Sequence, residues 1–129
     1  MKLRCITISD IKKIPILDEV TIKDDNMLYL DNLQESNLNA KELSKDNKEL
    51  FFLQLEPYIY AISTKDLFFI NFDETTRWDG ILPIYKNVKV MNKELWGDIV
   101  ILKMINDNIY GLTNDEIDKY IKLIKAENK

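Results

Sequence analysis

The chain has 129 residues, of which 46% are hydrophobic and 31% are charged, and its formal net charge is -4. This length suits one domain, and a content of 3 Gly and 3 Pro is unlike that of a collagen-like or linker-rich chain. With no histidine and one cysteine, Cys5, the chain excludes a Ser-His-Asp triad, a histidine general base and a zinc site of Cys and His ligands. We expect a single domain over residues 1–129, with no cofactor and no bound transition metal.

Charge and cysteine content also bear on partners and compartment. The lysines are scattered among the acids, and only Lys12 and Lys13 are adjacent, so we expect no nucleic-acid partner. The N-terminal apolar stretch is too short for a signal peptide, and no apolar run reaches the roughly 18 residues that span a bilayer. A single cysteine suits a reducing compartment. The sequence therefore predicts a cytoplasmic protein without membrane contact.

The chain opens with a predicted strand and a turn. Residues 3–8 are rich in residues that favour strands. Residues 9–10, Ser and Asp, can cap a short turn that runs through Ile11 and Ile14. Pro15 ends that turn because proline lacks an amide N–H.

Residues 16–22 and 27–33 flank Asp24, Asp25 and Asn26. Side chains of this type bond to nearby backbone and tolerate positive φ, so the pattern predicts a hairpin. The following residues, 34–48, are the most polar stretch of the chain. An N-x-x-E pattern that begins at Asn39 is compatible with a short helix, and an irregular connection fits equally well.

Residues 50–72 carry the clearest strand signal. Alternating side chains over residues 51–56 predict one strand, and residues 58–63 and 67–72 flank a three-residue turn, which predicts a hairpin. Two further short strands are expected at residues 81–85, at an edge because of Pro83, and at residues 88–91.

The segment 95–105 fits two structures. Ile99, Val100 and Ile101 favour a buried strand through β-branching, whereas Leu95, Ile99 and Leu102 fit one helical stripe. A second helix near residues 93–105 therefore stays open as an alternative to a strand.

The C-terminal helix is the best-specified element. Thr113 as N-cap with Glu116 three residues later makes a capping box, and Leu112 with Ile117 makes a hydrophobic staple. The helix should run over residues 114–127. Its apolar face consists of Ile117, Tyr120, Ile121 and Ile124. We expect an α+β fold, with a mainly antiparallel twisted sheet and this helix packed on one face.

The candidate site is the loop over residues 73–80. It combines acidic side chains with a tryptophan and an arginine, and loops held by a rigid sheet commonly carry recognition. Here the tryptophan can fill a pocket while the acids attract a basic partner. The predicted partner-binding residues are Asp73, Glu74, Arg77, Trp78 and Asp79.

Two other groups of side chains each fit more than one role. Short acid-x-lysine runs occur at residues 10–12 and 46–48 and are compatible with a small carboxylate- and metal-dependent hydrolase, although such pairs also arise by chance. A group of aromatic residues suits either a surface that grips a basic protein or plain core packing. Its members are Phe52, Tyr58, Tyr60, Trp78 and Trp96.

The composition favours a non-enzymatic protein-binding module. A small, acidic, cytoplasmic domain without histidine is typical of an inhibitor of the immunity-protein or antitoxin type, which would occlude the active site of a basic toxin. The alternatives are the small hydrolase named above and a structural or assembly subunit. The oligomeric state does not follow from the sequence.

Overall fold

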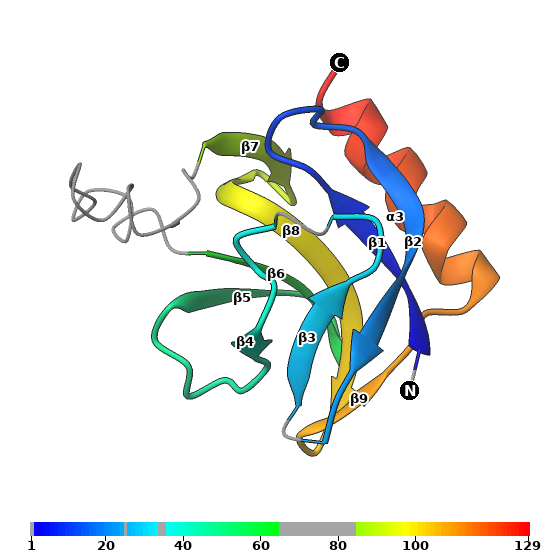
Figure 1. The fold of residues 1–129 in the computed structure, drawn as a ribbon. Coiled ribbons are helices and arrows are strands. Elements are labelled where there is room, and N and C mark those ends of the chain that lie inside the picture. The colour runs from blue at the N-terminus through cyan, green and yellow to red at the C-terminus, as the bar shows by residue number, and fades with distance from the viewer. Residues whose placement is uncertain (1, 25, 34–35, 65–84) are drawn as a thin grey trace, which may run out of the picture.

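The fold is one antiparallel β-sheet that curls into a half-barrel, with the C-terminal helix packed against it (Figure 1). The computed structural model describes residues 2–24, 26–33, 36–64 and 85–129. This architecture confirms the predicted α+β class. The described elements are β1 (Lys2–Ile8), β2 (Pro15–Ile22), β3 (Met27–Leu30), β4 (Lys41–Glu42), β5 (Leu50–Glu56), β6 (Ile59–Thr64), β7 (Lys86–Val90), β8 (Lys93–Ile105), β9 (Asn108–Tyr110) and α3 (Asn114–Glu127).

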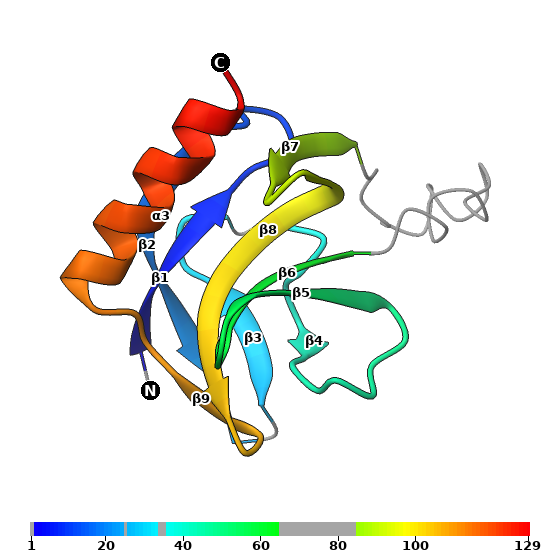
Figure 2. The ribbon, with the colours of Figure 1, turned by 180° about the vertical axis from the view of Figure 1, so that it is seen from behind.

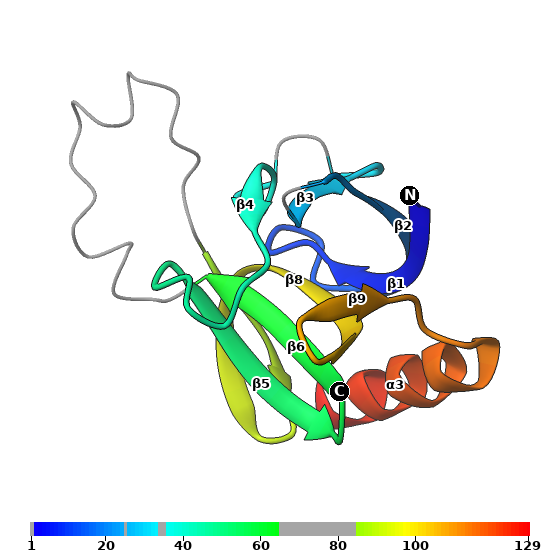
Figure 3. The same ribbon diagram turned by 90° about the horizontal axis from the view of Figure 1, so that it is seen from below.

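The strands follow the order β4-β3-β2-β1-β8-β6-β5, and β7 and β9 pair with the two ends of β8. Each pairing between these strands is antiparallel. Viewed from below, the curl brings β5 and β6 to one side and β2 and β3 to the other (Figure 3). The inner core fills the space between them, with Leu28, Leu50 and Leu102 among its buried members.

The central strand is β8, and it contains the segment 95–105, for which the sequence allowed either a strand or a helix. Its 13 residues pair with β1, β6, β7 and β9. Ile99 and Ile101 lie in the core that includes α3, whereas Val100 and Leu102 lie in the inner core. A strand covered on both faces is apolar throughout, which is why the segment also fitted a helical stripe. The alternative of a second helix near residues 93–105 is wrong.

The helix α3 has the predicted limits, and it contacts β1, β2 and β7 (Figure 2). Thr113 and Glu116 form the predicted capping box. Ile117, Tyr120 and Ile124 are buried against the sheet, while Ile121 is only partly buried. Within the described ranges, no helix has both the length and the apolar character that a membrane crossing requires.

The first predicted hairpin is confirmed, and the second has a different partner. β2 and β3 pair across the turn, where Asn26 has a φ of 58°. β6 lies between β5 and β8, so in the described structure its hairpin partner is the preceding strand β5. The expected pairing of residues 58–63 with 67–72 is therefore not the one that β6 makes. Residues 67–72 and most of the expected strand 81–85 lie outside the described residues.

The polar stretch before β5 has no helix in its described part. Asn39 accepts from the Leu30 amide at 2.7 Å and donates through Nδ2 to the Leu33 carbonyl at 2.9 Å. The Asn39 side chain, which the sequence pattern suggested as a helix cap, instead binds the stretch before β4 to the end of β3. The chain then forms the two-residue strand β4 and a turn that leads into β5.

Candidate functional site

The loop that the sequence singled out lies in the range 65–84, outside the described residues. The assignment of Asp73, Glu74, Arg77, Trp78 and Asp79 as partner-binding residues therefore stays a prediction.

The aromatic group is divided between core and surface. Phe52 and Tyr60 pack edge to face, with ring centroids 6.3 Å apart, and Tyr60 is buried. Trp96 is half-buried, and Tyr58 is exposed. Two of the aromatic side chains thus serve packing, and the described members do not form one exposed patch.

The largest concentration of exposed apolar side chains in the described structure lies on the β1–β2 hairpin. Four of the residues 11–17 are exposed aliphatic side chains, and we name them the hairpin patch: Ile11 (77% exposed), Ile14 (54%), Leu17 (49%) and Ile16 (43%). In the strand register Leu17 is opposite Ile6 and Ile16 is opposite Thr7, so these neighbours lie on opposite faces. The hairpin patch therefore wraps around the tip of the hairpin. Lys12 and Lys13 are exposed between its members.

The turn at this tip is held by hydrogen bonds to Ser9. The Lys13 amide donates to the Ser9 carbonyl at 2.8 Å. The Ile11 and Lys12 amides both point to Ser9 Oγ, at 3.1 and 3.3 Å. Lys13 adopts a φ of 57°, which reverses the chain before Pro15 opens β2. The exposed isoleucines are thus presented on an ordered turn.

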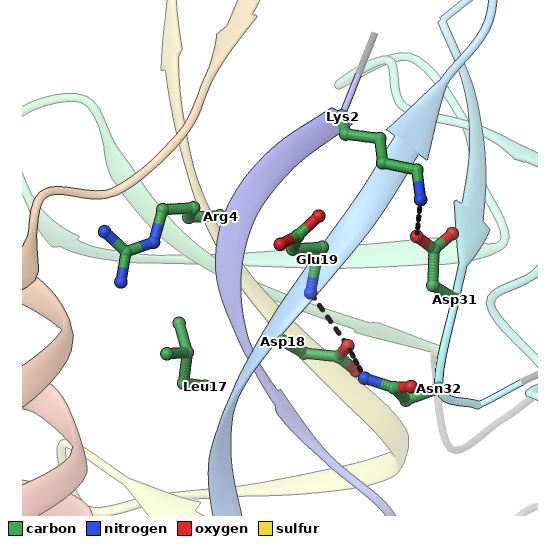
Figure 4. A pocket seen from close by; sticks show the side chains of 7 residues that line it. All are labelled: Lys2, Arg4, Leu17, Asp18, Glu19, Asp31 and Asn32. Carbon is green, nitrogen blue, oxygen red and sulfur yellow. Dashed lines mark hydrogen bonds and ion pairs between the residues drawn. The ribbon is translucent and has the colours of Figure 1, made fainter.

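Leu17 also lines an open depression of about 680 Å³ on the same hairpin (Figure 4). Two of its carboxylates are bound within the fold. Buried Asp18 accepts from the Thr7 hydroxyl at 2.8 Å, from the Glu19 amide at 2.7 Å and from the Asn32 side chain. Asp31 pairs with Lys2 at 3.2 Å. The full lining is Lys2, Arg4, Leu17, Asp18, Glu19, Asp31 and Asn32.

Arg4 and Glu19 are the charged residues of this depression whose side chains form no ion pair or hydrogen bond with another described residue. They are directly opposite each other in the β1–β2 register. The Arg4 side chain points away from Glu19 in Figure 4, and the ion pairs between described residues include neither of them. A partner can therefore reach both charges without first breaking an ion pair between described residues.

A buried polar cluster lies under the tip of the hairpin. Asp10 and Asp98 are each 6% exposed. The Asp10 amide donates to Asp98 Oδ1 at 2.9 Å, and the Tyr85 amide donates to Asp10 Oδ2 at 3.1 Å. Burial raises the pKa of Asp10, the Tyr85 amide opposes that rise, and the neighbouring Asp98 carboxyl adds to it.

Asparagines extend this cluster to other strands. The Asp98 amide donates to Asn37 Oδ1 at 3.1 Å. Asn87 donates to the carbonyls of Ile8 and Gly97, at 2.9 and 2.8 Å. The cluster thus joins the β1–β2 turn, the chain before β4, and the strands β7 and β8.

The acid-x-lysine runs do not lie on strands. Asp10 and Lys12 belong to the β1–β2 turn, and residues 46–48 lie in the stretch that leads to β5. A metal-dependent hydrolase of the kind considered from the sequence would need both groups to project from one face of a strand. Among the described residues, no cluster of three or more acidic or cysteine side chains is arranged to hold a metal ion.

Comparison with protein-family models, with curated proteins and with solved structures finds no match for this chain. Sequence reasoning missed the hairpin patch because it read Ile11 and Ile14 only as parts of a turn. The sequence did contain a sign of this patch, because these two isoleucines lie in a short turn between Ser9-Asp10 and Pro15.

Proposed function

We propose that this chain is a non-enzymatic protein-binding module whose contact surface is the hairpin patch. The carrying observation is that four exposed aliphatic side chains gather within residues 11–17. Single exposed apolar residues are ordinary, whereas a contiguous group on a soluble domain marks an interaction site. The hydrogen bonds to Ser9 order the turn before binding, which reduces the entropy lost on association.

The shape of the hairpin patch favours a concave partner. Ile16 and Leu17 lie on opposite faces of β2, so a flat surface could cover only one of them. A cleft on the partner would cover both faces and bury the tip residue Ile11 at its base. Such insertion fits a protein that inhibits by occlusion.

The charges support a basic partner of the kind that an immunity protein or antitoxin neutralises. The net charge of -4 would steer a basic protein toward this chain, most strongly at low salt. At the tip, Lys12 and Lys13 would suit acidic groups at the base of the cleft. Glu19, which pairs with no described lysine or arginine, lies next to the hairpin patch and is available to basic side chains at the rim of the cleft. These features fit the active-site cleft of a basic toxin.

Affinity capture from the native host tests this proposal when three forms are compared. Wild type is set against the double variant Ile11→Ser with Ile14→Ser, and against Tyr110→Ser, which alters an exposed apolar residue on β9. We expect wild type and Tyr110→Ser to retain one basic protein in stoichiometric amount. The double variant should lose most of it while keeping its circular dichroism spectrum.

Salt dependence provides a second readout. Retention should weaken as ionic strength rises, because screening removes the long-range attraction. Equal retention by the double variant and by wild type would count against the hairpin patch as the contact surface. A captured partner that is acidic would count against the inhibitor type.

A further inference from the structure

Tyr85 is an exposed tyrosine that the fold places next to the hairpin patch. It directly precedes β7, and it is 49% exposed. Its amide donates to Asp10 Oδ2 at 3.1 Å, and Asp10 directly precedes Ile11, the most exposed member of the hairpin patch. Two residues that are 75 positions apart in the sequence therefore meet where the β1–β2 turn begins.

We propose that Tyr85 belongs to the same contact surface as the hairpin patch, and that its ring binds a cationic side chain of the partner. The identity of the partner as a basic protein rests on the function proposed above. A cation is attracted to the face of an aromatic ring because the ring quadrupole is negative there. Tyrosine is also among the residues that contribute most often to the binding energy of interfaces.

Other aromatic rings of this chain already bind cations of the chain itself. Lysine ammonium groups lie 4.5–5.6 Å from the ring centroids of Tyr29, Phe51, Tyr60 and Tyr120. Within the described ranges, the ring of Tyr85 has no such lysine. A cation from another molecule can therefore bind there without displacing a described lysine or arginine.

The backbone of Tyr85 is fixed on both sides. Its amide is bound by the Asp10 carboxylate, and its carbonyl accepts from the Gly97 amide at 2.8 Å. The Asp10 amide in turn donates to Asp98 Oδ1 at 2.9 Å, which ties the turn to β8. These bonds hold Tyr85 and the hairpin turn in one position relative to each other before a partner arrives. Less ordering is then needed on association.

Two buried carboxylates place negative charge next to Tyr85. Asp10 and Asp98 are each 6% exposed, and neither forms an ion pair with a described lysine or arginine. Lys86, the residue after Tyr85, is paired with Glu94 at 3.1 Å. Buried charges are screened by salt much less than exposed ones. The local charge therefore favours a cation over an anion at Tyr85.

The partner is expected to present two kinds of charge. Lys12 and Lys13 on the turn suit acidic groups at the base of the cleft, as proposed above. Tyr85 lies outside the turn, next to its first residues, and suits a basic group at the rim of the cleft. Arginine fits this position better than lysine, because its planar guanidinium is weakly hydrated and stacks on aromatic faces.

The test compares dissociation constants for the basic protein that wild type retains in the capture experiment, after that protein is identified and purified. Tyr85→Leu keeps an apolar side chain but removes the ring, whereas Tyr85→Phe keeps the ring. Tyr110→Leu is the matched control, because Tyr110 is 45% exposed and lies on β9. We expect Tyr85→Leu to raise the dissociation constant by about 3- to 30-fold. Tyr85→Phe and Tyr110→Leu should bind as wild type does.

Three results would overturn the proposal. Tyr85→Leu could bind as tightly as wild type, or Tyr110→Leu could lose as much affinity as Tyr85→Leu. Equal losses in Tyr85→Phe and Tyr85→Leu would assign the effect to the hydroxyl and exclude the contact between ring and cation. Circular dichroism controls for folding, and Tyr85→Met, which also lacks a ring, replaces Tyr85→Leu if that variant does not fold.

The hairpin patch is tested separately in the same measurement. If the double variant Ile11→Ser with Ile14→Ser binds as wild type and Tyr85→Leu does not, the hairpin patch is excluded and Tyr85 remains a contact. The opposite result excludes Tyr85 and leaves the hairpin patch as the contact surface. Capture that retains no basic protein would contradict both proposals.

Discussion

Thr113 and Glu116 close the first turn of α3 on each other. The Glu116 amide donates to Thr113 Oγ1 at 3.2 Å, and the Thr113 amide donates to Glu116 Oε1 at 2.8 Å. Lys103 on β8 also binds Glu116, at 3.0 Å, so the cap of the helix is tied to the central strand. The start of α3 is therefore fixed both by its own sequence and by the sheet.

Removal of the cap hydroxyl should destabilise the protein. Thr113→Ala leaves the Glu116 amide without its acceptor, and we expect a loss of about 0.5–2 kcal/mol in the free energy of unfolding. Thr113→Ser keeps the hydroxyl and should lose much less. Urea denaturation of the three proteins measures the difference, and equal midpoints for the Ala and Ser variants would contradict the role of the hydroxyl.

Glu116 should make part of the stability depend on pH. Burial acts to raise its pKa, but the bonds from Thr113 and Lys103 outweigh it, so the pKa lies below its ordinary value. A lowered pKa means that the stabilisation is present above the ordinary glutamate pKa of about 4.3 and is lost as the pH falls through the lowered value. Glu116→Gln should thus differ from wild type most at neutral pH, and the difference should shrink in acid. Denaturation of both proteins from neutral to acid pH tests this prediction. A stability difference that stays constant with pH would contradict the role given to the ionised Glu116 side chain.

Gly97 should not tolerate a side chain. Its φ is +72°, and a Cβ there would overlap the Thr64 hydroxyl and lie 2.9 Å from Asn37 Oδ1. Gly97→Ala should therefore cost more than the roughly 1–2 kcal/mol of the left-handed conformation alone. In the double variant with Thr64→Ala, part of that cost should be relieved, so the two changes should not add. Strict additivity in thermal denaturation would show that the overlap is unimportant.

The helix–sheet contact should depend on the fully buried side of α3. Ile124 is 0% exposed, and Ile124→Ala should cost about 2–5 kcal/mol through lost burial and an unfilled cavity. The same change at the partly buried Ile121 should cost clearly less. Calorimetry measures the loss of unfolding free energy in each variant. A larger loss for the Ile121 variant than for the Ile124 variant would mean that α3 packs on the sheet through a different face.

Elements with local signals were predictable. The capping box of α3 is contained in four residues, and its staple in six, so no distant information was needed. In the turn before Met27, Asn26 adopts a φ of 58°, a conformation that asparagine tolerates well. These features could be predicted because the residues that cause them are neighbours in the chain.

Pairing over long distances was not predictable from periodicity. The residue pattern over 58–63 predicts a strand but does not indicate which strands lie beside it. One of its two neighbours, β8, is about 40 residues away in the sequence. Both faces of β8 are buried, so its sequence lacks the alternation of apolar and polar residues that distinguishes a strand from a helix. The missing information lay in the arrangement of the whole sheet.

The candidate site was missed for the same reason. Ile11 and Ile14 are apolar, and only the arrangement of neighbouring elements shows that nothing in the described structure covers them. The contact between Asp10 and Asp98 joins residues that are 88 positions apart in the sequence. Sequence reasoning favoured the acidic loop at residues 73–80 because its unusual residues are adjacent.

The most direct test of the central claim is site-specific photo-crosslinking in the native host. A photoreactive amino acid is placed at position 14, within the hairpin patch, or at position 110 on β9 as the matched exposed control. If the hairpin patch inserts into a partner protein, position 14 should give one dominant crosslinked product to a basic protein, and position 110 should not. A product of equal yield from position 110, or none from position 14, would contradict the claim that this hairpin is the binding surface.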